Sequence, residues 1–148
     1  MSPRANRKLV VIGAGMASGR MLETIVAAGG FDVTLFNAEP RGNYNRLMLS
    51  PVLSGEKTYE EIVTHDDAWY VAHGVECRFG EPVVRIDRDR RVVHSHNGDV
   101  PYDALVISTG SAPFIIPVPG KDLAGVCTYR DLEDTNAMIA ASVPGSKA

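Results

Sequence analysis

The chain has 148 residues, of which 45% are hydrophobic and 22% charged, and a formal net charge of -3. This length predicts one domain with a hydrophobic core of its own, and the composition excludes disordered, fibrous and nucleic-acid-binding proteins. No run approaches 18 apolar residues, so no membrane span is predicted. Cys77 and Cys127 lie far apart without a C-x-x-C motif, which predicts two reduced core thiols and no zinc site or redox pair.

The first residues superficially imitate a secretory signal, because Arg4, Arg7 and Lys8 precede an apolar stretch. Gly13 and Gly15 interrupt that stretch after only a few residues. The pattern therefore favours a β-strand at the start of a cytoplasmic protein.

The chain then begins with a β-α-β pattern. Residues 8–13, "KLVVIG", form a short β-branched run that ends in glycine. Residues 16–28 carry apolar side chains at helical spacing, and two glycines follow them. Residues 31–39, "FDVTLFNAE", resume as a buried strand. This order predicts two parallel strands joined by a right-handed crossover.

The middle of the chain predicts short helices. Thr58 and Glu61 have the spacing of a capping box, and one or two helices are expected between them and residue 74. Residues 75–79, "VECRF", form the next predicted strand.

Alternating strands and turns follow. Residues 82–109 predict a strand, a charged turn, a second strand, an Asn97-Gly98 turn and a final apolar strand, which together make a meander carried on the main sheet. A proline-rich loop and a helix near residues 131–141 complete the pattern. His94 and His96 alternate on one strand face, but two histidines without a third ligand nearby predict no metal site.

The glycine turn after the first strand is the first chemical signal. Residues 13–18 read "GAGMAS", so Gly13 and Gly15 match the G-x-G-x-x-G fingerprint and Ser18 stands in place of the third glycine. The backbone N–H groups at the helix start, at Met16 and Ala17, would face a pyrophosphate. A glycine turn in an ordinary α/β protein is the alternative.

An acidic residue at the end of the second strand is the second signal. Glu39 lies 26 positions after Gly13, near where dinucleotide sites place a carboxylate that accepts hydrogen bonds from a ribose. A solvated loop carboxylate is the alternative. Glycine turn, helix, strand and acid in this order favour a dinucleotide site.

The remaining pattern favours a flavin nucleotide. A nicotinamide dehydrogenase would continue with further β-α-β repeats, whereas this chain inserts a helical loop and a meander. Residues 105–113, "LVISTGSAP", resemble the A-T-G motif of flavoproteins that bind two dinucleotides, with Ser108 in place of the usual alanine.

Three segments, "VVIGAGMASGR", "LFNAEPRGNYNRLMLSPVLSGEKTYEEIV" and "YDALVISTGSAPFIIPVPGKDL", closely resemble one family. This is the N-terminal FAD domain of the large subunit of NAD(P)H-dependent assimilatory nitrite reductase, in the pyridine nucleotide-disulfide oxidoreductase superfamily. The resemblance runs from Lys8 to about Ile139. Rubredoxin and ferredoxin reductases are similar too, but they more often carry a lysine where Pro51 stands.

The resemblance implies an α/β fold: a Rossmann-like FAD/NAD(P)-binding domain with a central parallel sheet, helices on one side and a β-meander on the other. It implies one FAD-binding domain over residues 1–148, cut before an NAD(P)H domain that would begin near residue 147. "PGSKA", residues 144–148, would be the start of that domain's first strand.

The resemblance also implies cofactor contacts. Arg46 would neutralise phosphate charge, and the apolar residues after it would shield the flavin ring, although an arginine pointing outward from a core-packed loop is the alternative. Val83 would meet the adenine through its backbone, unless it is a plain strand valine, and Arg130 would approach FAD, unless it is a surface arginine. The other implied contacts are Tyr44, Thr109 and Gly110. No residue has the pattern of a catalytic acid, base or nucleophile.

The implied function is electron entry, in which FAD accepts hydride from NADH or NADPH and passes electrons toward iron-sulfur and siroheme centres that reduce nitrite to ammonia. The iron-sulfur cluster, siroheme and NAD(P)H sites are expected only in a full-length protein, and these residues alone are expected to be inactive. Homodimer formation stays open. A rubredoxin or ferredoxin reductase type of oxidoreductase and a non-enzymatic nucleotide-binding module are the alternatives.

Overall fold

The computed structural model describes residues 6–145. The chain divides into two compact units, which are described separately. The first unit comprises the residues up to Tyr44 together with Val63–Gly110, and the second comprises Asn45–Ile62 together with the residues from Ser111 onward. None of the helices within residues 6–145 has the length and apolar character that crossing a membrane requires.

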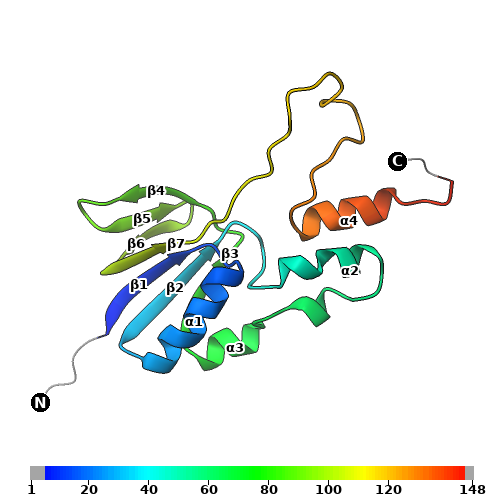
Figure 1. The fold of residues 1–148 in the computed structure, drawn as a ribbon. Helices are drawn as coiled ribbons and strands as arrows, with labels where there is room; N and C mark the ends of the chain where they lie inside the picture. The colour runs from blue at the N-terminus through cyan, green and yellow to red at the C-terminus, as the bar shows by residue number, and fades with distance from the viewer. Residues whose placement is uncertain (1–5, 146–148) are drawn as a thin grey trace, which may run out of the picture. The chain divides into compact units, whose positions relative to one another are not determined.

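A four-stranded parallel sheet forms the centre of the first unit (Figure 1). The strands are β1 (Arg7–Ile12), β2 (Phe31–Asn37), β3 (Val75–Phe79) and β7 (Ala104–Ile107). They are ordered β3-β2-β1-β7, so the first strand of the chain lies between the second and the last. Both faces of β1 are buried along Leu9–Ile12, which explains why this stretch is uniformly apolar rather than alternating.

Two helices cover one face of this sheet (Figure 1). Helix α1 (Met16–Ala28) ends where Gly29 takes a positive φ of 69° and its N–H bonds to the Ile25 carbonyl at 3.0 Å. Helix α3 (Asp67–Ala72) begins at Asp66, whose carboxylate accepts a hydrogen bond from the Trp69 N–H at 2.8 Å. The core between sheet and helices comprises Leu9, Val11, Ala14, Leu22, Val33, Leu35, Tyr70 and Val75.

A three-stranded antiparallel sheet packs against the other face through Val93, which is fully buried beside Val10, Ile12 and Phe36. Its strands are β4 (Val83–Asp87), β5 (Val92–Ser95) and β6 (Gly98–Pro101). The predicted fold class, a Rossmann-like domain with helices on one side of a parallel sheet and a β-meander on the other, is therefore confirmed.

The strand prediction after the Asn97-Gly98 turn was wrong in one respect. Instead of one final strand, the chain forms β6 in the antiparallel sheet and then β7 in the parallel sheet, so the meander is a sheet of its own. The break follows Pro101, which has no N–H to donate to a ladder. Asp103 then joins the chain to the start of β1. Its carboxylate accepts a hydrogen bond from the Lys8 N–H at 2.7 Å, and its own N–H donates to the Lys8 carbonyl at 2.8 Å.

The two cysteines differ in environment. Both are free thiols; Cys77 is half-buried against the core, and burial raises its pKa to about 12, with smaller contributions from Asp67 and Glu76. Cys127 is exposed, so the prediction of a core position for it was wrong. It lies in residues 111–131, which form no helix or strand and so offer it no packed face.

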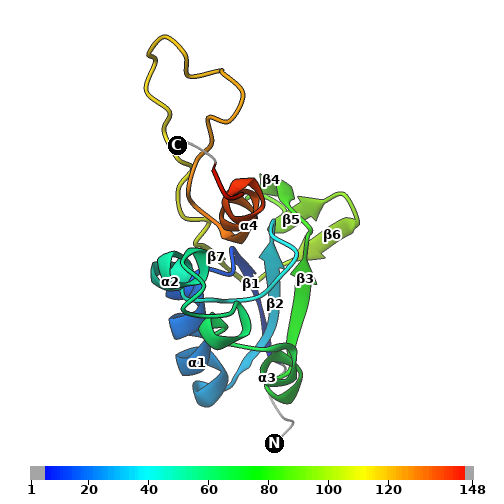
Figure 2. The ribbon, with the colours of Figure 1, turned by 90° about the vertical axis from the view of Figure 1, so that its right-hand side faces the viewer.

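The second unit is built from short helices. Helix α2 (Leu49–Leu53) contacts α4 (Leu132–Ala141), and α4 confirms the helix predicted near residues 131–141 (Figure 2). The capping box is also confirmed, because the Thr58 N–H donates to Glu61 Oε2 at 2.7 Å and the Glu61 N–H to Thr58 Oγ1 at 3.4 Å. The elements are the 3-10 helix η1 (Arg46–Met48), α2 (Leu49–Leu53), the 3-10 helix η2 (Glu60–Ile62) and α4 (Leu132–Ala141).

Candidate functional site

The turn after β1 requires glycine at its first position. Gly13 has a φ of 102°, and a Cβ built on it would lie 2.4 Å from the Ser108 carbonyl oxygen. The Gly13 N–H donates to the Phe36 carbonyl at 2.8 Å, and the Ser108 hydroxyl donates to the Gly13 carbonyl at 3.1 Å. The turn is therefore fixed between the ends of β2 and β7 at a separation that leaves no room for a side chain.

Gly15 has a different environment at the start of α1. It is the N-cap residue with a φ of -89°, which any residue can adopt, and a Cβ built on it would meet no atom within 4 Å. No side chain among the described residues caps this helix end by a hydrogen bond. The first turn, Met16 to Gly19, contains no acidic residue. The start of α1 therefore has no capping side chain and no acidic residue in its first turn, and the space beside Gly15 is open, as an anion-binding position requires.

Ser18 is buried where the fingerprint has its third glycine. Its hydroxyl donates to the Gly15 carbonyl at 2.9 Å, so a small polar residue fits here. Gly19, the next residue, is also closely packed, because a Cβ there would lie 3.0 Å from Asn43 Nδ2 and 3.2 Å from His65 Cε1.

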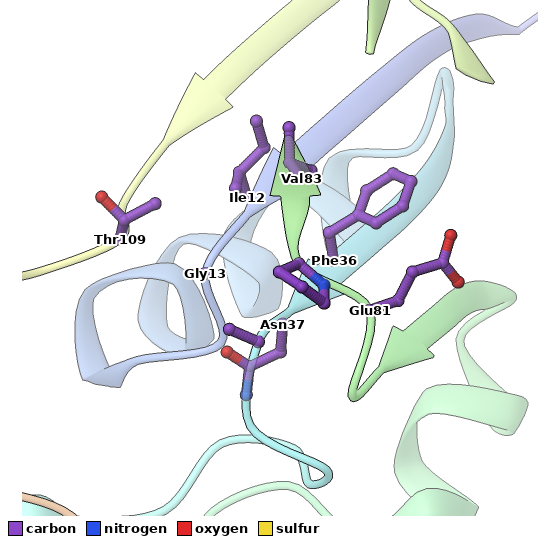
Figure 3. A pocket seen from close by; sticks show the side chains of 9 residues that line it. Ile12, Gly13, Phe36, Asn37, Glu81, Val83 and Thr109 are labelled. Atoms are coloured by element: carbon purple, nitrogen blue, oxygen red, sulfur yellow. The ribbon is translucent and has the colours of Figure 1, made fainter. Parts of the chain in front are cut away.

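A cavity of about 140 Å³ opens at the carboxyl ends of the parallel strands (Figure 3). One water molecule needs about 10–15 Å³ of such cavity volume, so this cavity has room for a larger group. β1 lies here between β2 and β7, where the chain changes direction across the sheet, and open α/β sheets bind ligands at this switch point. The cavity is lined by Ile12, Gly13, Phe36, Asn37, Ala38, Glu81, Pro82, Val83 and Thr109.

Three residues predicted from distant parts of the sequence thus meet in one place, because Gly13, Val83 and Thr109 line the same cavity. Gly110 follows Thr109 as an exposed residue with a φ of 73°. Met16 and Ala17 are exposed at the start of α1. Their contacts with a cofactor remain predictions.

Asn37, at the end of β2, is a site residue that the sequence interpretation missed. Its side-chain oxygen accepts from the Ala14 N–H at 3.4 Å, and its Nδ2 donates to the Arg41 carbonyl at 2.7 Å. It therefore connects the glycine turn to the loop that follows β2. A polar residue ending an otherwise apolar strand, "VTLFN", was the available signal.

Glu39 is half-buried rather than solvated. Its carboxylate accepts a hydrogen bond from the Tyr44 hydroxyl at 2.9 Å and lies 3.7 Å from Arg41 Nη1. Tyr44 is itself 1% exposed, so its ring belongs to the core. The alternative of a solvated loop carboxylate is wrong, whereas the predicted contact between Glu39 and a ribose stays a prediction.

Glu81 is a buried carboxylate at the cavity wall that the sequence interpretation also missed. A hydrogen bond from the Ser95 hydroxyl is the largest cause that lowers its pKa, against the opposing effect of burial, and Arg78 Nη1 at 3.5 Å lowers it further. Glu81 thereby ties the connection between β3 and β4 to β5.

We expect Glu81→Gln to reduce the acid sensitivity of the fold. Because the folded-state pKa of Glu81 lies below its ordinary value of 4.5, the ionised carboxylate stabilises the fold above pH 4.5, and this contribution disappears as the pH falls through the folded-state pKa. Urea unfolding should therefore show a smaller difference between pH 7 and acid pH for Glu81→Gln than for the parent chain. An unchanged difference would contradict the assignment.

Arg46 and Arg130 both belong to the second unit and lie together there. Arg46 Nη1 donates to the Arg130 carbonyl at 3.2 Å, and Arg130 Nε donates to the Ser111 carbonyl at 2.8 Å. The Ser50 and Tyr129 hydroxyls add a second contact between the same two segments at 3.2 Å. Both arginines are half-buried, and their predicted approach to FAD stays a prediction.

The apolar residues after Arg46 divide by exposure. Leu49 is buried, Met48 is half-buried and Leu47 is 76% exposed.

His94, on the antiparallel sheet, has Asp99 at 2.6 Å and Arg85 at 2.8 Å as neighbours. Residues 6–145 contain no group of three or more potential ligands that could hold a metal ion.

A parallel sheet with a glycine turn feeding its first helix, and a cavity at the switch point, defines a Rossmann-like nucleotide-binding domain. The sequence model of the pyridine nucleotide-disulphide oxidoreductase family matches residues 7–148. The chain therefore belongs to this family.

Its relatives include nitrite reductase [NAD(P)H] of Bacillus subtilis, which is 41% identical over 96% of this chain. The ferredoxin–NAD(+) reductase component of the biphenyl dioxygenase system of Paraburkholderia xenovorans is 33% identical over 93% of the chain. In the crystal structure of the covalent putidaredoxin reductase-putidaredoxin complex, a protein chain superposes with a TM-score of 0.80 at 25% identity, over 93% of this chain and 34% of its own length. The present chain spans only 18% of the nitrite reductase and 34% of the ferredoxin reductase component.

Proposed function

We propose that this chain is the FAD-binding domain of an NAD(P)H-dependent nitrite reductase large subunit. The observation that carries the proposal is the open N-terminus of α1 at Gly15, next to the cavity that Gly13, Val83 and Thr109 line. An anion held at the helix end and a ring held in the cavity suit a nucleotide cofactor. Family membership and the nitrite reductase relative support FAD and NAD(P)H as the nucleotides.

The residues fit FAD part by part. The N–H groups of Met16 and Ala17 would hold the pyrophosphate, Glu39 a ribose hydroxyl, and the backbone at Val83 the adenine. Within the second unit, Arg46 presents a guanidinium, which can donate two parallel hydrogen bonds to a phosphate.

When bound, FAD supplies hydride acceptance from NAD(P)H and the release of single electrons. The residues of this chain would bind and orient it. In the complete protein, electrons would pass to iron-sulfur and siroheme centres and reduce nitrite to ammonia in the cytoplasm. The predicted NAD(P)H domain would begin near residue 147, which lies outside the described residues. Residues 1–148 would then form one FAD-binding domain, and a homodimer stays an option for the complete protein.

A ferredoxin reductase type of oxidoreductase is the second candidate, which the relative from Paraburkholderia favours. The two candidates share the FAD domain and differ in the electron acceptor. Reduction of a ferredoxin, without reduction of nitrite, by the complete protein would favour the second candidate. A purified chain that binds nucleotides but never acquires flavin absorbance bands would favour a non-enzymatic module instead.

The proposal is tested by titrating the purified chain with FAD and then adding NADH without oxygen while following flavin absorbance. We expect FAD to bind, weakly, and NADH to leave it oxidised, because hydride transfer requires a donor within about 3 to 3.5 Å that a nicotinamide site must position. No FAD binding at any concentration would overturn the proposal. Rapid bleaching would instead show that residues 1–148 are themselves a complete reductase.

We expect Glu39→Ala to weaken FAD binding by about ten-fold, since hydrogen bonds to a charged group contribute roughly 1.5 to 3 kcal/mol. Tyr44→Phe is the matched control, because it removes the same internal hydrogen bond and leaves the carboxylate in place. FAD fluorescence quenching measures both. Equal weakening by the two variants would mean that the Tyr44 hydroxyl, itself an implied cofactor contact, accounts for the loss, and that the direct contact of Glu39 with a ribose is wrong.

A further inference from the structure

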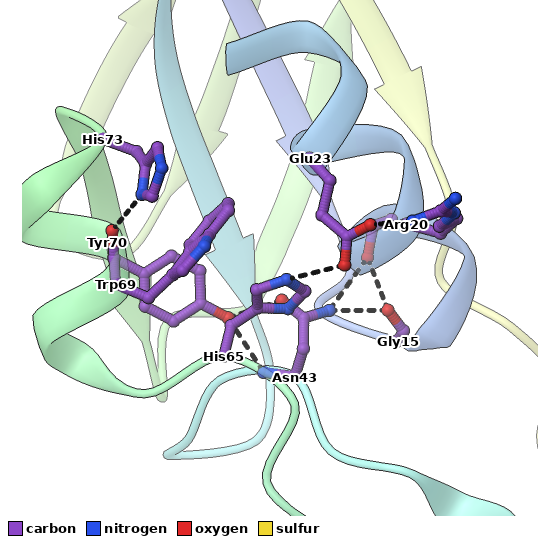
Figure 4. A network of polar contacts seen from close by, with 9 residues as sticks. Gly15, Arg20, Glu23, Asn43, His65, Trp69, Tyr70 and His73 are labelled. Atoms are coloured by element: carbon purple, nitrogen blue, oxygen red, sulfur yellow. Dashed lines mark hydrogen bonds and ion pairs between the residues drawn. The ribbon is translucent and has the colours of Figure 1, made fainter. Parts of the chain in front are cut away.

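Asn43 is a fully buried side chain that reaches the start of α1 from another segment (Figure 4). Its Nδ2 donates to the Gly15 carbonyl at 2.5 Å and lies 3.4 Å from Ser18 Oγ. The Gly15 carbonyl also accepts from the Ser18 hydroxyl at 2.9 Å and from the Gly19 N–H at 3.0 Å. One carbonyl therefore receives three hydrogen bonds at the end of the helix where a phosphate would bind.

We propose that Asn43 is a positioning residue that orients and polarises the phosphate-facing peptide between Gly15 and Met16. The proposal rests on the proposed function, since it assigns Asn43 an effect on the same phosphate position. The carbonyl of Gly15 and the N–H of Met16 belong to one planar peptide unit. Hydrogen bonds to the carbonyl polarise that unit, and linked hydrogen bonds strengthen one another. Asn43 thus makes the Met16 N–H a stronger donor without touching the ligand.

The position of Asn43 is determined by its own contacts. Its N–H donates to the Tyr70 hydroxyl at 2.9 Å, and the same hydroxyl donates to Asn43 Oδ1. Its carbonyl accepts from the Thr64 N–H at 3.0 Å. Gly42 allows this approach, because a Cβ there would lie 2.7 Å from the Tyr70 hydroxyl oxygen. Since the side-chain oxygen is occupied by Tyr70, the Nδ2 group has to face Gly15.

An amide is the side chain that this geometry requires. A carboxylate at position 43 would set an acceptor against the Gly15 carbonyl and would add negative charge near the helix end that is to receive a phosphate. An alanine would leave the carbonyl with two donors and would remove the Oδ1 atom that accepts from the Tyr70 hydroxyl. Both changes weaken the phosphate position while the cavity beside Val83 keeps its lining.

The experiment compares ADP with adenosine by NMR titration of the ¹⁵N-labelled chain. ADP carries the pyrophosphate and adenosine does not. We expect Asn43→Ala to weaken ADP binding by roughly two- to five-fold, because a linked hydrogen bond changes the strength of its neighbour by about 10–30% and Asn43 does not contact the ligand itself. Adenosine binding should stay unchanged, and the Met16 amide ¹⁵N resonance of the ligand-free variant should move upfield.

Val75→Ala is the control for lost stability, because it removes buried methyl groups from the core at the first residue of β3, whereas the glycine turn follows the last residue of the parallel strand β1. It should leave both affinities and the Met16 resonance unchanged. If Asn43→Ala does not fold, Tyr70→Phe replaces it in the experiment, because it removes the hydroxyl that orients Asn43. This variant should also bind ADP more weakly than the parent chain does.

The outcomes separate the two proposals. If the parent chain prefers ADP and Asn43→Ala keeps that preference in full, the role of Asn43 is overturned and the proposed function stands. If the parent chain binds neither ADP nor FAD, the proposed function fails. In that case a Met16 resonance that stays in place in Asn43→Ala overturns the role of Asn43 as well, whereas an upfield shift upholds its effect on the peptide.

Discussion

Gly13→Ala is expected to destabilise the chain by about 3 to 5 kcal/mol, in the range that few single substitutions reach. Two effects add at this position. The φ of 102° is strained for any residue with a side chain, and the new methyl group would lie 2.4 Å from the Ser108 carbonyl oxygen. That oxygen belongs to the backbone after β7, which two hydrogen bonds from Ser108 hold against Ile12 and Gly13. Relief of the clash therefore requires the sheet to shift.

Gly74→Ala separates strain from the clash. Gly74 also has a positive φ, of 65°, but a Cβ built on it would meet no atom within 4 Å. Strain alone should cost about 1 to 2 kcal/mol. Urea unfolding measures both variants against the parent chain. If Gly13→Ala lowers the free energy of unfolding no more than Gly74→Ala does, the contact between the glycine turn and Ser108 is softer than its distance indicates.

Gly15→Ala is expected to have the opposite profile, with a small loss of stability and a large loss of FAD binding. Its φ of -89° suits alanine, and the added methyl group meets no protein atom, so the exchange at an N-cap should cost at most about 1 kcal/mol. The methyl group would occupy the space through which a pyrophosphate approaches the backbone. We expect FAD affinity to fall by about two powers of ten, equivalent to roughly 2.7 kcal/mol.

Fluorescence quenching of FAD and urea unfolding together test this prediction. Thr24→Ala, on the exposed middle of α1, is the control and should leave both quantities unchanged. If Gly15→Ala binds FAD as tightly as the parent chain, the cofactor does not approach the start of α1. If it binds poorly but also unfolds as readily as Gly13→Ala, the loss of binding follows from the loss of structure.

Several features could be predicted from the sequence because each is determined by neighbouring residues. Helix α1 follows from the spacing of its apolar side chains and the glycine at its end, and the capping box of Thr58 and Glu61 needs only a separation of three residues. The apolar run of β1 indicated a buried parallel strand. Gly13 and Gly15 were both identified, although their different reasons for being glycine were not.

Contacts between distant segments were decided by the tertiary structure alone. Asn43 reaches Gly15 from 28 positions away, and its Nδ2 would lie 3.0 Å from a Cβ built on Gly19. The buried carboxylate of Glu81 accepts a hydrogen bond from Ser95 of the neighbouring sheet. Cys127 is exposed, although a core position was predicted for it. Periodicity and turn chemistry describe a few consecutive residues at a time. The partner of a buried amide or carboxylate depends instead on which segments the sheet brings together, so the sequence determined the framework of this domain and folding selected the contacts that shape its site.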